Sequence, residues 1–482
     1  MGINTNHFIA RSGASKGSTP IYLITKDIWE DKNKLTGSFA GGLAKSQGFE
    51  GKPGQTLIVP NPQTGKTKAV FLGIDSKDNM WALSNLAASQ RDGKYHINDQ
   101  EMKLSKDQAY KMSLGWALAR YRFEIKNGKF NSDPKEGATL VLPGSVDKKY
   151  EELVAEIEAT WLVRDLINKP ANILNTNELS QETISLAKMF NVSASDIVDI
   201  TGPALEEQFP LIHTVGKASE NEPHLTYFSW SGSNAKEDAP KVLLVGKGVT
   251  FDTGGLDLKT AASMKGMKKD MGGAAHVLGL SHMIMSNDLP IHLHVMTPIA
   301  ENSVNANAFR PSDVITARDG TGVFIGNTDA EGRLIMADAL SYGSETWDPD
   351  LIIDFATLTG AQRIADGTDV GAIFTNDIKA GRELEDLGEQ WNDDLKHHKM
   401  FEKHHVHLKP PPADGGDVSS SCPGPGAEMA AWFLRHFTRA ANKATWIHYD
   451  INGANVSSSP GRPKGGEAMG MRAAYRFIKN QL

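Results

Sequence analysis

The stretch Asn327-Thr328-Asp329-Ala330-Glu331-Gly332-Arg333 decides how the rest of the chain is interpreted. Two carboxylates stand two residues apart, and an apolar run over 334–337 follows at once. Two acids and an arginine beside apolar residues are costly to bury unless a metal ion or an ion partner compensates the charge. The alternative is a polar turn before a helix, with both acids stabilised by the helix N-terminus. This stretch alone does not separate the two interpretations.

The composition indicates an ordinary globular protein. A chain of 482 residues corresponds to about two to four domains. The net charge of −7 argues against nucleic-acid binding, which needs a basic surface. The single cysteine, Cys422, allows no intramolecular disulfide and points to a reducing compartment. Neither a secretory signal nor an apolar run of about 20 residues is found, so we expect a soluble cytoplasmic protein without membrane contact.

Residues 1–150 are predicted to form an N-terminal α/β domain without catalytic residues. A helix is expected over 106–121. Short apolar runs between turn residues predict buried strands at 21–24, 56–59, 69–72 and 139–142. A connecting helix is expected over 151–170, where apolar residues recur at helical spacing until Pro170 disrupts the pattern.

Residues 171–482 alternate between strand and helix patterns and are predicted to form a second domain. Helices are expected over 272–285, 334–347 and 428–438, and strands over 242–245, 291–295, 351–355 and 446–451. Helices between buried strands imply a mixed or parallel sheet that is covered on both faces. The predicted fold is therefore α/β, with two domains that each hold a mixed sheet flanked by helices. Ligands of such sheets bind beyond the carboxyl ends of the strands.

Three stretches at or near predicted strand ends carry the charged residues of a candidate site. They lie at 246–259, 267–275 and 327–333. They supply the acids Asp252, Asp270, Asp329 and Glu331 and the cations Lys247, Lys259 and Arg333. Four converging carboxylates repel strongly at separations of ~4 Å in a low-dielectric site. Two divalent ions would remove that repulsion, as in two-metal hydrolytic sites.

The residue types indicate which ions fit. Carboxylates without histidine or cysteine favour manganese, zinc or magnesium. Positive charge and desolvation both lower a lysine's pKa, so a neutral Lys247 could be a further ligand. Lys259 suits a different role, which is donation to an oxyanion.

These segments resemble the leucyl aminopeptidase family of dimetal exopeptidases. NTDAEGR at 327–333 is close to the family signature, and the stretches GKGVTFDTGG and KKDMGGAA match at the expected spacings. Lys247 and Asp252 are five residues apart, and Asp252 and Asp270 eighteen. The resemblance runs from about 168 to 451, whereas the first 150 residues match only in size and composition. It implies that the C-terminal domain is catalytic and removes leucine or other apolar N-terminal residues from peptides.

The resemblance also implies roles for individual residues. Asp252 and Glu331 would bridge two divalent ions. A water or hydroxide between the ions would attack the scissile carbonyl. Lys259 would stabilise the gem-diolate that this attack produces. Arg333 would hold a bicarbonate that acts as general base, and the free α-amine of the substrate would bind one ion. The implied metal ligands are Lys247, Asp252, Asp270, Asp329 and Glu331. The implied first-residue pocket is lined by Met267, Asn327, Thr357 and the stretch after Asp450. A homohexamer, a dimer of trimers with its sites facing an inner cavity, is implied as well.

The chain departs from the family pattern in three places. Asp257 is an extra acid beside the site, and Tyr449 and Asn452 replace smaller or apolar residues, so the first pocket is expected to be more polar or smaller. The proline-rich loop at 410–426 differs from the usual acidic loop and is expected to flank the entrance.

A group of five histidines and the single cysteine are two further candidate sites. The histidines at 397, 398, 404, 405 and 407 lie among lysines, which disfavour metal capture, so they are predicted to be a solvated surface. Cys422 has no positioned base in the sequence and is interpreted as a free loop thiol. Two alternative functions are kept: a DNA-binding or regulatory protein, tested by salt-dependent binding, and a dimetal phosphoesterase.

Overall fold

The computed structural model describes residues 8–31, 38–90, 92–98, 100–126, 129–131 and 137–482. The chain divides into two compact units. The first contains residues 1–161 and the short segment Ser458–Pro463, and the second contains Leu162–Ser457 and Lys464–Leu482. The α-helix α5 (Tyr150–Asn168) spans the boundary near Trp161.

The first unit is built on a six-stranded mixed sheet. The strand order is β1 (Ile9–Ala10), β8 (Thr139–Val141), β5 (Lys94–Asn98), β2 (Thr19–Ile24), β4 (Thr67–Gly73) and β3 (Thr56–Pro60). All pairs are parallel except β3 with β4. The four predicted strands are present. β5 was not predicted, because its sequence KYHIN holds only two apolar residues that become buried.

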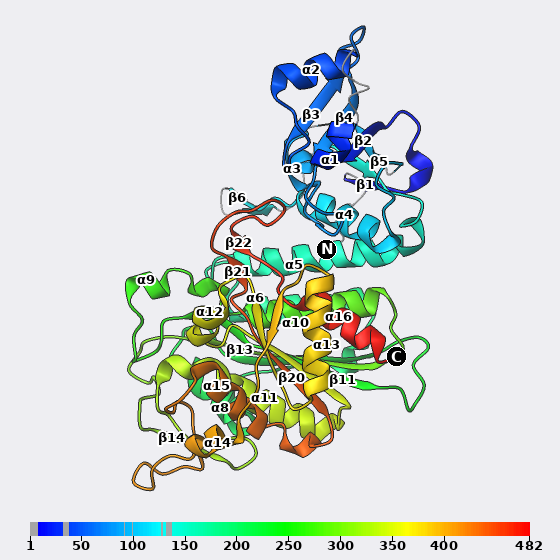
Figure 1. Cartoon of the computed structure of the whole chain (residues 1–482). Helices are drawn as coiled ribbons and strands as arrows, with labels where there is room; N and C mark the ends of the chain where they lie inside the picture. The colour runs from blue at the N-terminus through cyan, green and yellow to red at the C-terminus, as the bar shows by residue number, and fades with distance from the viewer. Residues whose placement is uncertain (1–7, 32–37, 91, 99, 127–128, 132–136) are drawn as a thin grey trace. The chain divides into compact units, whose positions relative to one another are not determined.

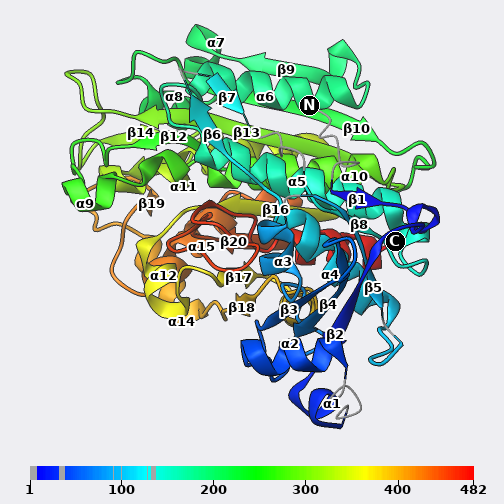
Figure 2. The same cartoon turned by 90° about the horizontal axis from the view of Figure 1, so that it is seen from above.

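The second unit is built on a nine-stranded mixed sheet, which confirms the predicted fold class. The strand order is β18 (Leu395–His397), β17 (Gly371–Thr375), β20 (Thr445–Asp450), β16 (Leu351–Ala356), β11 (Lys241–Gly246), β13 (His292–Asn302), β10 (His224–Ser231) and β9 (Ile197–Ile200), with β12 (Gly248–Asp252) paired to β13. The central strands β20, β16, β11 and β13 are parallel, and β17 and β10 run antiparallel to their inner neighbours. Figure 2 labels most of these strands, from β9 at one edge of the sheet to β18 at the other.

Helices cover both faces of the large sheet, as Figure 1 shows. One face carries α6 (Thr176–Met189), α10 (Gly272–Ser286), α16 (Met471–Asn480) and α13 (Ile378–Gln390), and the other carries α8 (Pro210–Gly216), α11 (Glu331–Trp347) and α15 (Gly426–His436). Helix α10 is buried along almost its whole length, because it packs between the sheet and α16. That burial explains why its sequence is apolar all round. No helix among the described residues is long and apolar enough to cross a membrane.

Two element boundaries differ from the predictions and matter for the site. Helix α11 begins at Glu331, three residues before the predicted start, after the 3-10 turn η7 (Thr328–Ala330). Strand β13 continues to Asn302, well past the predicted end at 295. Its Pro298 lies where the parallel neighbour changes from β11 to β12, so the missing N–H interrupts no pairing on that side.

The carboxyl ends of the parallel strands meet at one edge of the sheet. Lys247 follows β11, Asn302 ends β13, Thr357 follows β16 and Asp450 ends β20. This edge is where open α/β sheets bind ligands.

Candidate metal centre

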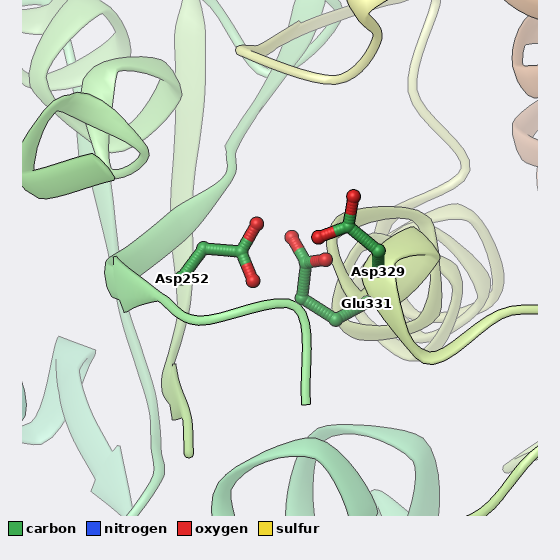
Figure 3. Close-up of side chains that lie close together, drawn as sticks. All are labelled: Asp252, Asp329 and Glu331. Carbon is green, nitrogen blue, oxygen red and sulfur yellow. The ribbon is translucent and has the colours of Figure 1, made fainter. Parts of the chain in front are cut away.

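The four predicted acids lie on four different short segments at this edge. Asp252 ends β12, Asp270 follows the 3-10 helix η6 (Met267–Lys269), Asp329 lies in η7 and Glu331 is the first residue of α11. Figure 3 shows the side chains of Asp252, Asp329 and Glu331 pointing toward one another, with one oxygen of each within 4.8 Å of the others. The structure therefore brings together acids that are up to 79 residues apart in the sequence.

Two lysines divide the four acids between them. Lys247 Nζ lies 2.7 Å from Asp270 Oδ2 and 2.8 Å from Glu331 Oε1. Lys259 Nζ lies 2.8 Å from Asp252 Oδ2 and 2.5 Å from Asp329 Oδ1. The cluster is strongly buried except at Asp329. Four negative charges thus face two positive ones, which leaves a net negative site that a divalent ion would neutralise.

The buried oxygens support the same conclusion. Glu331 Oε2 has no hydrogen-bond partner among the described residues, although Glu331 is 1% exposed. A buried carboxylate oxygen without a donor is costly. Burial raises the pKa of Glu331 well above its ordinary value, and the neighbouring Asp252 carboxylate raises it further. The residues therefore fit a divalent metal site, with Glu331 Oε2 as an oxygen that still lacks a partner.

The charge state of Lys247 depends on the same balance. Burial alone lowers its pKa, but the carboxylates of Asp270 and Glu331 outweigh that effect and raise it above the ordinary value. A neutral lysine ligand would need the positive charge of bound ions to outweigh the carboxylates.

Two side chains hold the acid-bearing segments in place. Asn302 donates from Nδ2 to Asp252 Oδ1 at 2.9 Å and to the Thr328 carbonyl at 3.1 Å. Asp257, the extra acid, accepts from the Thr328 N–H at 2.7 Å. Asp257 therefore anchors the η7 turn beside Asp329. Sequence reasoning missed Asn302 because the predicted strand ended before it.

A cavity of about 530 Å³ opens beside these acids. The predicted pocket residues Met267, Asn327 and Thr357 all line it. Thr357 Oγ1 donates to Asp270 Oδ1 at 2.8 Å, and the Asn327 side chain accepts from the Asp329 N–H at 2.8 Å. Two of the three pocket residues thus also orient acids of the cluster.

The stretch after Asp450 reaches the cavity through Ile451 and Asn452. Tyr449 does not line it. Its ring is fully buried and stacks on Phe355 with ring centroids 4.2 Å apart, because alternate residues of a strand point to opposite faces. The loop at 410–426 contributes Ser421 and Gly426 to the lining.

Arg333 lines the cavity from the first turn of α11. Its Nη1 donates to the Ser420 carbonyl at 2.7 Å, whereas its buried Nε has no partner among the described residues. The neighbouring Gly332 leaves room for Lys247, since a Cβ there would lie 2.6 Å from Lys247 Nζ. This glycine is what allows helix and lysine to approach.

The two histidines of the 397–407 group with described ion pairs lie outside this arrangement, whereas Cys422 lies close enough to Arg333 for the two groups to interact electrostatically. His398 Nε2 pairs with Asp366 at 2.7 Å, and His404 Nδ1 pairs with Glu428 at 2.9 Å. These partners differ, so the two rings do not converge on one ion. Burial raises the pKa of the half-buried Cys422 thiol, which disfavours the reactive thiolate.

The fold and the acid cluster define a class, that of hydrolases that depend on a metal held at the strand ends of an α/β sheet. Known families identify the chain further. Residues 161–475 match the cytosol aminopeptidase family, catalytic domain, and residues 19–143 match the M17 aminopeptidase N-terminal domain. The chain belongs to the M17 cytosol aminopeptidase family, whose members are metal-dependent exopeptidases, and the resemblance found in the sequence is confirmed.

Individual relatives match over nearly their whole length. A probable cytosol aminopeptidase of Dechloromonas aromatica is 32% identical over 92% of this chain and 91% of its own. The crystal structure of a cytosol aminopeptidase from Coxiella burnetii is 35% identical, with a TM-score of 0.89 over 98% of this chain and 99% of its own. The bottromycin maturation enzyme BotP, solved in complex with Mn, is 26% identical, with a TM-score of 0.84 over 96% of this chain and 99% of its own.

Proposed function

We propose that this enzyme removes the N-terminal residue of short peptides with two divalent ions held by the cluster described above. The residues that would hold the ions are Lys247, Asp252, Asp270, Asp329 and Glu331. The observation that carries this proposal is the gathering of four acids around two lysines, with Glu331 Oε2 left without a partner. Manganese or zinc fits this oxygen-rich set, and magnesium is a third candidate.

The ions, when bound, polarise the scissile carbonyl and lower the pKa of the attacking water. The chain's own residues supply the other steps. Lys259 carries its ammonium at the acid cluster, where it donates to the oxygen that becomes negative as the carbonyl is attacked. Arg333 would hold a bicarbonate, which would supply the general base for the reaction. The unpartnered Nε of Arg333 supports this role, because a planar oxyanion fits the guanidinium fork.

The substrates proposed are peptides with a free N-terminus, with leucine or another apolar residue first. A free α-amine can bind an ion, whereas an acylated one cannot. Met267, Leu358 and Ile451 give the cavity apolar lining for such a side chain. We also propose that the second of the two units carries out catalysis. The protein is proposed to be cytoplasmic, as the name of its relatives, cytosol aminopeptidases, suggests. A homohexamer is proposed as its oligomeric state.

Hydrolysis of leucine p-nitroanilide tests the proposal directly. The metal-free protein is reloaded with manganese or zinc, and the free and N-acetylated substrates are compared for the wild type and Glu331→Ala. We expect metal-dependent release from the free amine only, and its loss in the variant. Release from both substrates would contradict the role of the amine. Turnover of a phosphomonoester but no aminoacyl amide would favour the dimetal phosphoesterase, and salt-dependent duplex binding without turnover would favour the DNA-binding alternative.

A further inference from the structure

Two cations of the cavity have no role in the chemistry proposed above. Lys247 and Lys259 pair with the acids, and Arg333 bonds the Ser420 carbonyl. Lys269 and Arg363 also line the cavity. Among the described residues, neither has an ion pair or a hydrogen-bond partner.

These two cations lie on the side of the cavity that is proposed to take the first residue. Lys269 ends the 3-10 helix that begins with Met267 and directly precedes Asp270. Arg363 lies in α12 (Gly360–Asp366), which begins three residues after Thr357. The two side chains are close enough for their charges to repel each other. Positive charge therefore reaches the first-residue pocket from two separate elements.

Besides the proposed ligand Asp270, one further acid acts electrostatically on Lys269, and its oxygens are already engaged by other donors. Asp450 acts electrostatically on Lys269, but its oxygens accept from the Leu358 N–H at 3.0 Å and from the N–H and hydroxyl of Thr359 at 3.1 and 2.6 Å. Asp450 thus holds the loop after β16. An apolar substrate side chain would cover Lys269 and Arg363 without giving either of them a partner, which is unfavourable for a charged group.

We infer that Lys269 and Arg363 bind a carboxylate on the side chain of the first residue, so that peptides beginning with glutamate or aspartate are substrates beside those beginning with apolar residues and are cleaved faster than their neutral amide counterparts. This inference rests on the proposed aminopeptidase function and makes its substrate class specific. A carboxylate offers two oxygens to the two cations, and charge-assisted hydrogen bonds of this kind are roughly twice as strong as neutral ones. The apolar lining accommodates leucine, and the cations raise acidic first residues above their neutral isosteres.

The test compares substrates that differ in one charge. Aminomethylcoumarin amides of glutamate, its neutral isostere glutamine, and leucine are assayed with the manganese-loaded enzyme. We expect kcat/KM for glutamate to exceed that for glutamine by about tenfold or more. In Lys269→Met this ratio should fall by about tenfold, and in Arg363→Met by less because Arg363 is more exposed. Lys269→Arg should retain most of the ratio.

Lys265→Met is the matched control. Lys265 is an exposed lysine four residues before Lys269 and does not line the cavity, so its loss changes the net charge alone. It should leave both substrates unchanged, and thermal unfolding of each variant confirms that it is folded. A glutamate-to-glutamine ratio of one or less in the wild type, with leucine turned over, would overturn the inference.

The α-carboxylate of a dipeptide is the other possible source of the negative charge. Leu-Gly and Leu-Gly-amide separate it from the side-chain carboxylate, because only the first has a free terminal carboxylate. If the lysine and arginine variants lost discrimination between these two dipeptides and kept the glutamate-to-glutamine ratio, the cations would read the terminal carboxylate and the inference would be wrong. Turnover of no aminoacyl substrate would overturn the proposed function, and the inference with it.

Discussion

Helix α11 buries two acids, and their surroundings differ completely. Glu331 at its first position and Asp338 two turns later are 1% and 0% exposed. Asp338 Oδ2 accepts from the Leu211 N–H at 2.8 Å, and its Oδ1 accepts from the Arg318 N–H at 3.0 Å. Among the described residues, Glu331 forms an ion pair with Lys247 alone, at 2.8 Å, and its Oε2 has no hydrogen-bond partner.

The difference separates a structural acid, Asp338, from a proposed metal ligand, Glu331. Leu211 lies in the first turn of α8, so Asp338 satisfies backbone donors at a helix start that would otherwise be unpaired. Both of its oxygens are used, and an ion could bind only by breaking those bonds. Glu331 has an oxygen to offer and a cationic partner that a metal can replace. Burial alone therefore does not mark a functional acid, whereas the kind of donor does.

The largest effect is expected from Glu331→Gln. Losing this proposed metal ligand should lower kcat/KM for leucine p-nitroanilide by about 10³-fold or more. The unfolding free energy without added metal should hardly change, because Lys247 keeps Asp270 as its partner. Activity and urea unfolding are measured on the same preparation. Near-normal activity would show that Glu331 is not a ligand and would remove the contrast with Asp338.

Asp338→Ala should give the opposite pattern. Unpairing the backbone N–H groups of Leu211 and Arg318 in the core should lower the unfolding free energy by about 3 kcal/mol. Manganese affinity should stay the same, since Asp338 touches none of the proposed ligands. Urea unfolding and a manganese titration provide the two readouts. If Asp338→Ala lost manganese affinity and kept its stability, Asp338 would be the metal ligand and the contrast with Glu331 would be wrong.

The stabilisation that manganese gives to the folded protein also distinguishes Glu331 from Asp338. Manganese at about 100 times its dissociation constant should raise the unfolding free energy of the wild type by about 2.7 kcal/mol. The same increment is expected for Asp338→Ala and none for Glu331→Gln. Thermal unfolding after chelation, with and without manganese, measures it. An increment that survives in Glu331→Gln would place the ion elsewhere.

The smallest expected effect is a pH dependence from Asp338. Burial raises its pKa from 3.8 to about 7, against the lowering effect of its backbone donors. The folded protein then binds more protons than the unfolded chain between these two values, so stability falls as pH rises through that range. Between pH 6 and 8 this group should reduce the unfolding free energy by about 1 kcal/mol. The variant Asp338→Ala should lack this pH dependence. The unfolding free energy of the wild type minus that of the variant should therefore fall between pH 6 and 8, and a rise would contradict the raised pKa of Asp338.

The same contrast explains what the sequence could predict. The acids at 252, 270, 329 and 331 were recognisable because each lies in a glycine-rich or polar segment next to a strand or helix pattern. The role of Asp338 was not visible, because its donors come from Leu211 and Arg318, which are 127 and 20 residues away. Asn302 was hidden by a strand that continues through a proline. The sequence did not reveal contacts between residues that are distant in the chain and meet only in the fold.

The glycine beside Arg333 also bears on how this enzyme can evolve. A Cβ at Gly332 would lie 2.6 Å from Lys247 Nζ, so a substitution there has to displace the end of the lysine side chain from Asp270 and Glu331. Arg363 is exposed on a short helix and bonds to nothing described, so it can be replaced without disturbing the acids. Under the inference drawn above, a substitution at Arg363 would change substrate preference and leave the acid cluster in place.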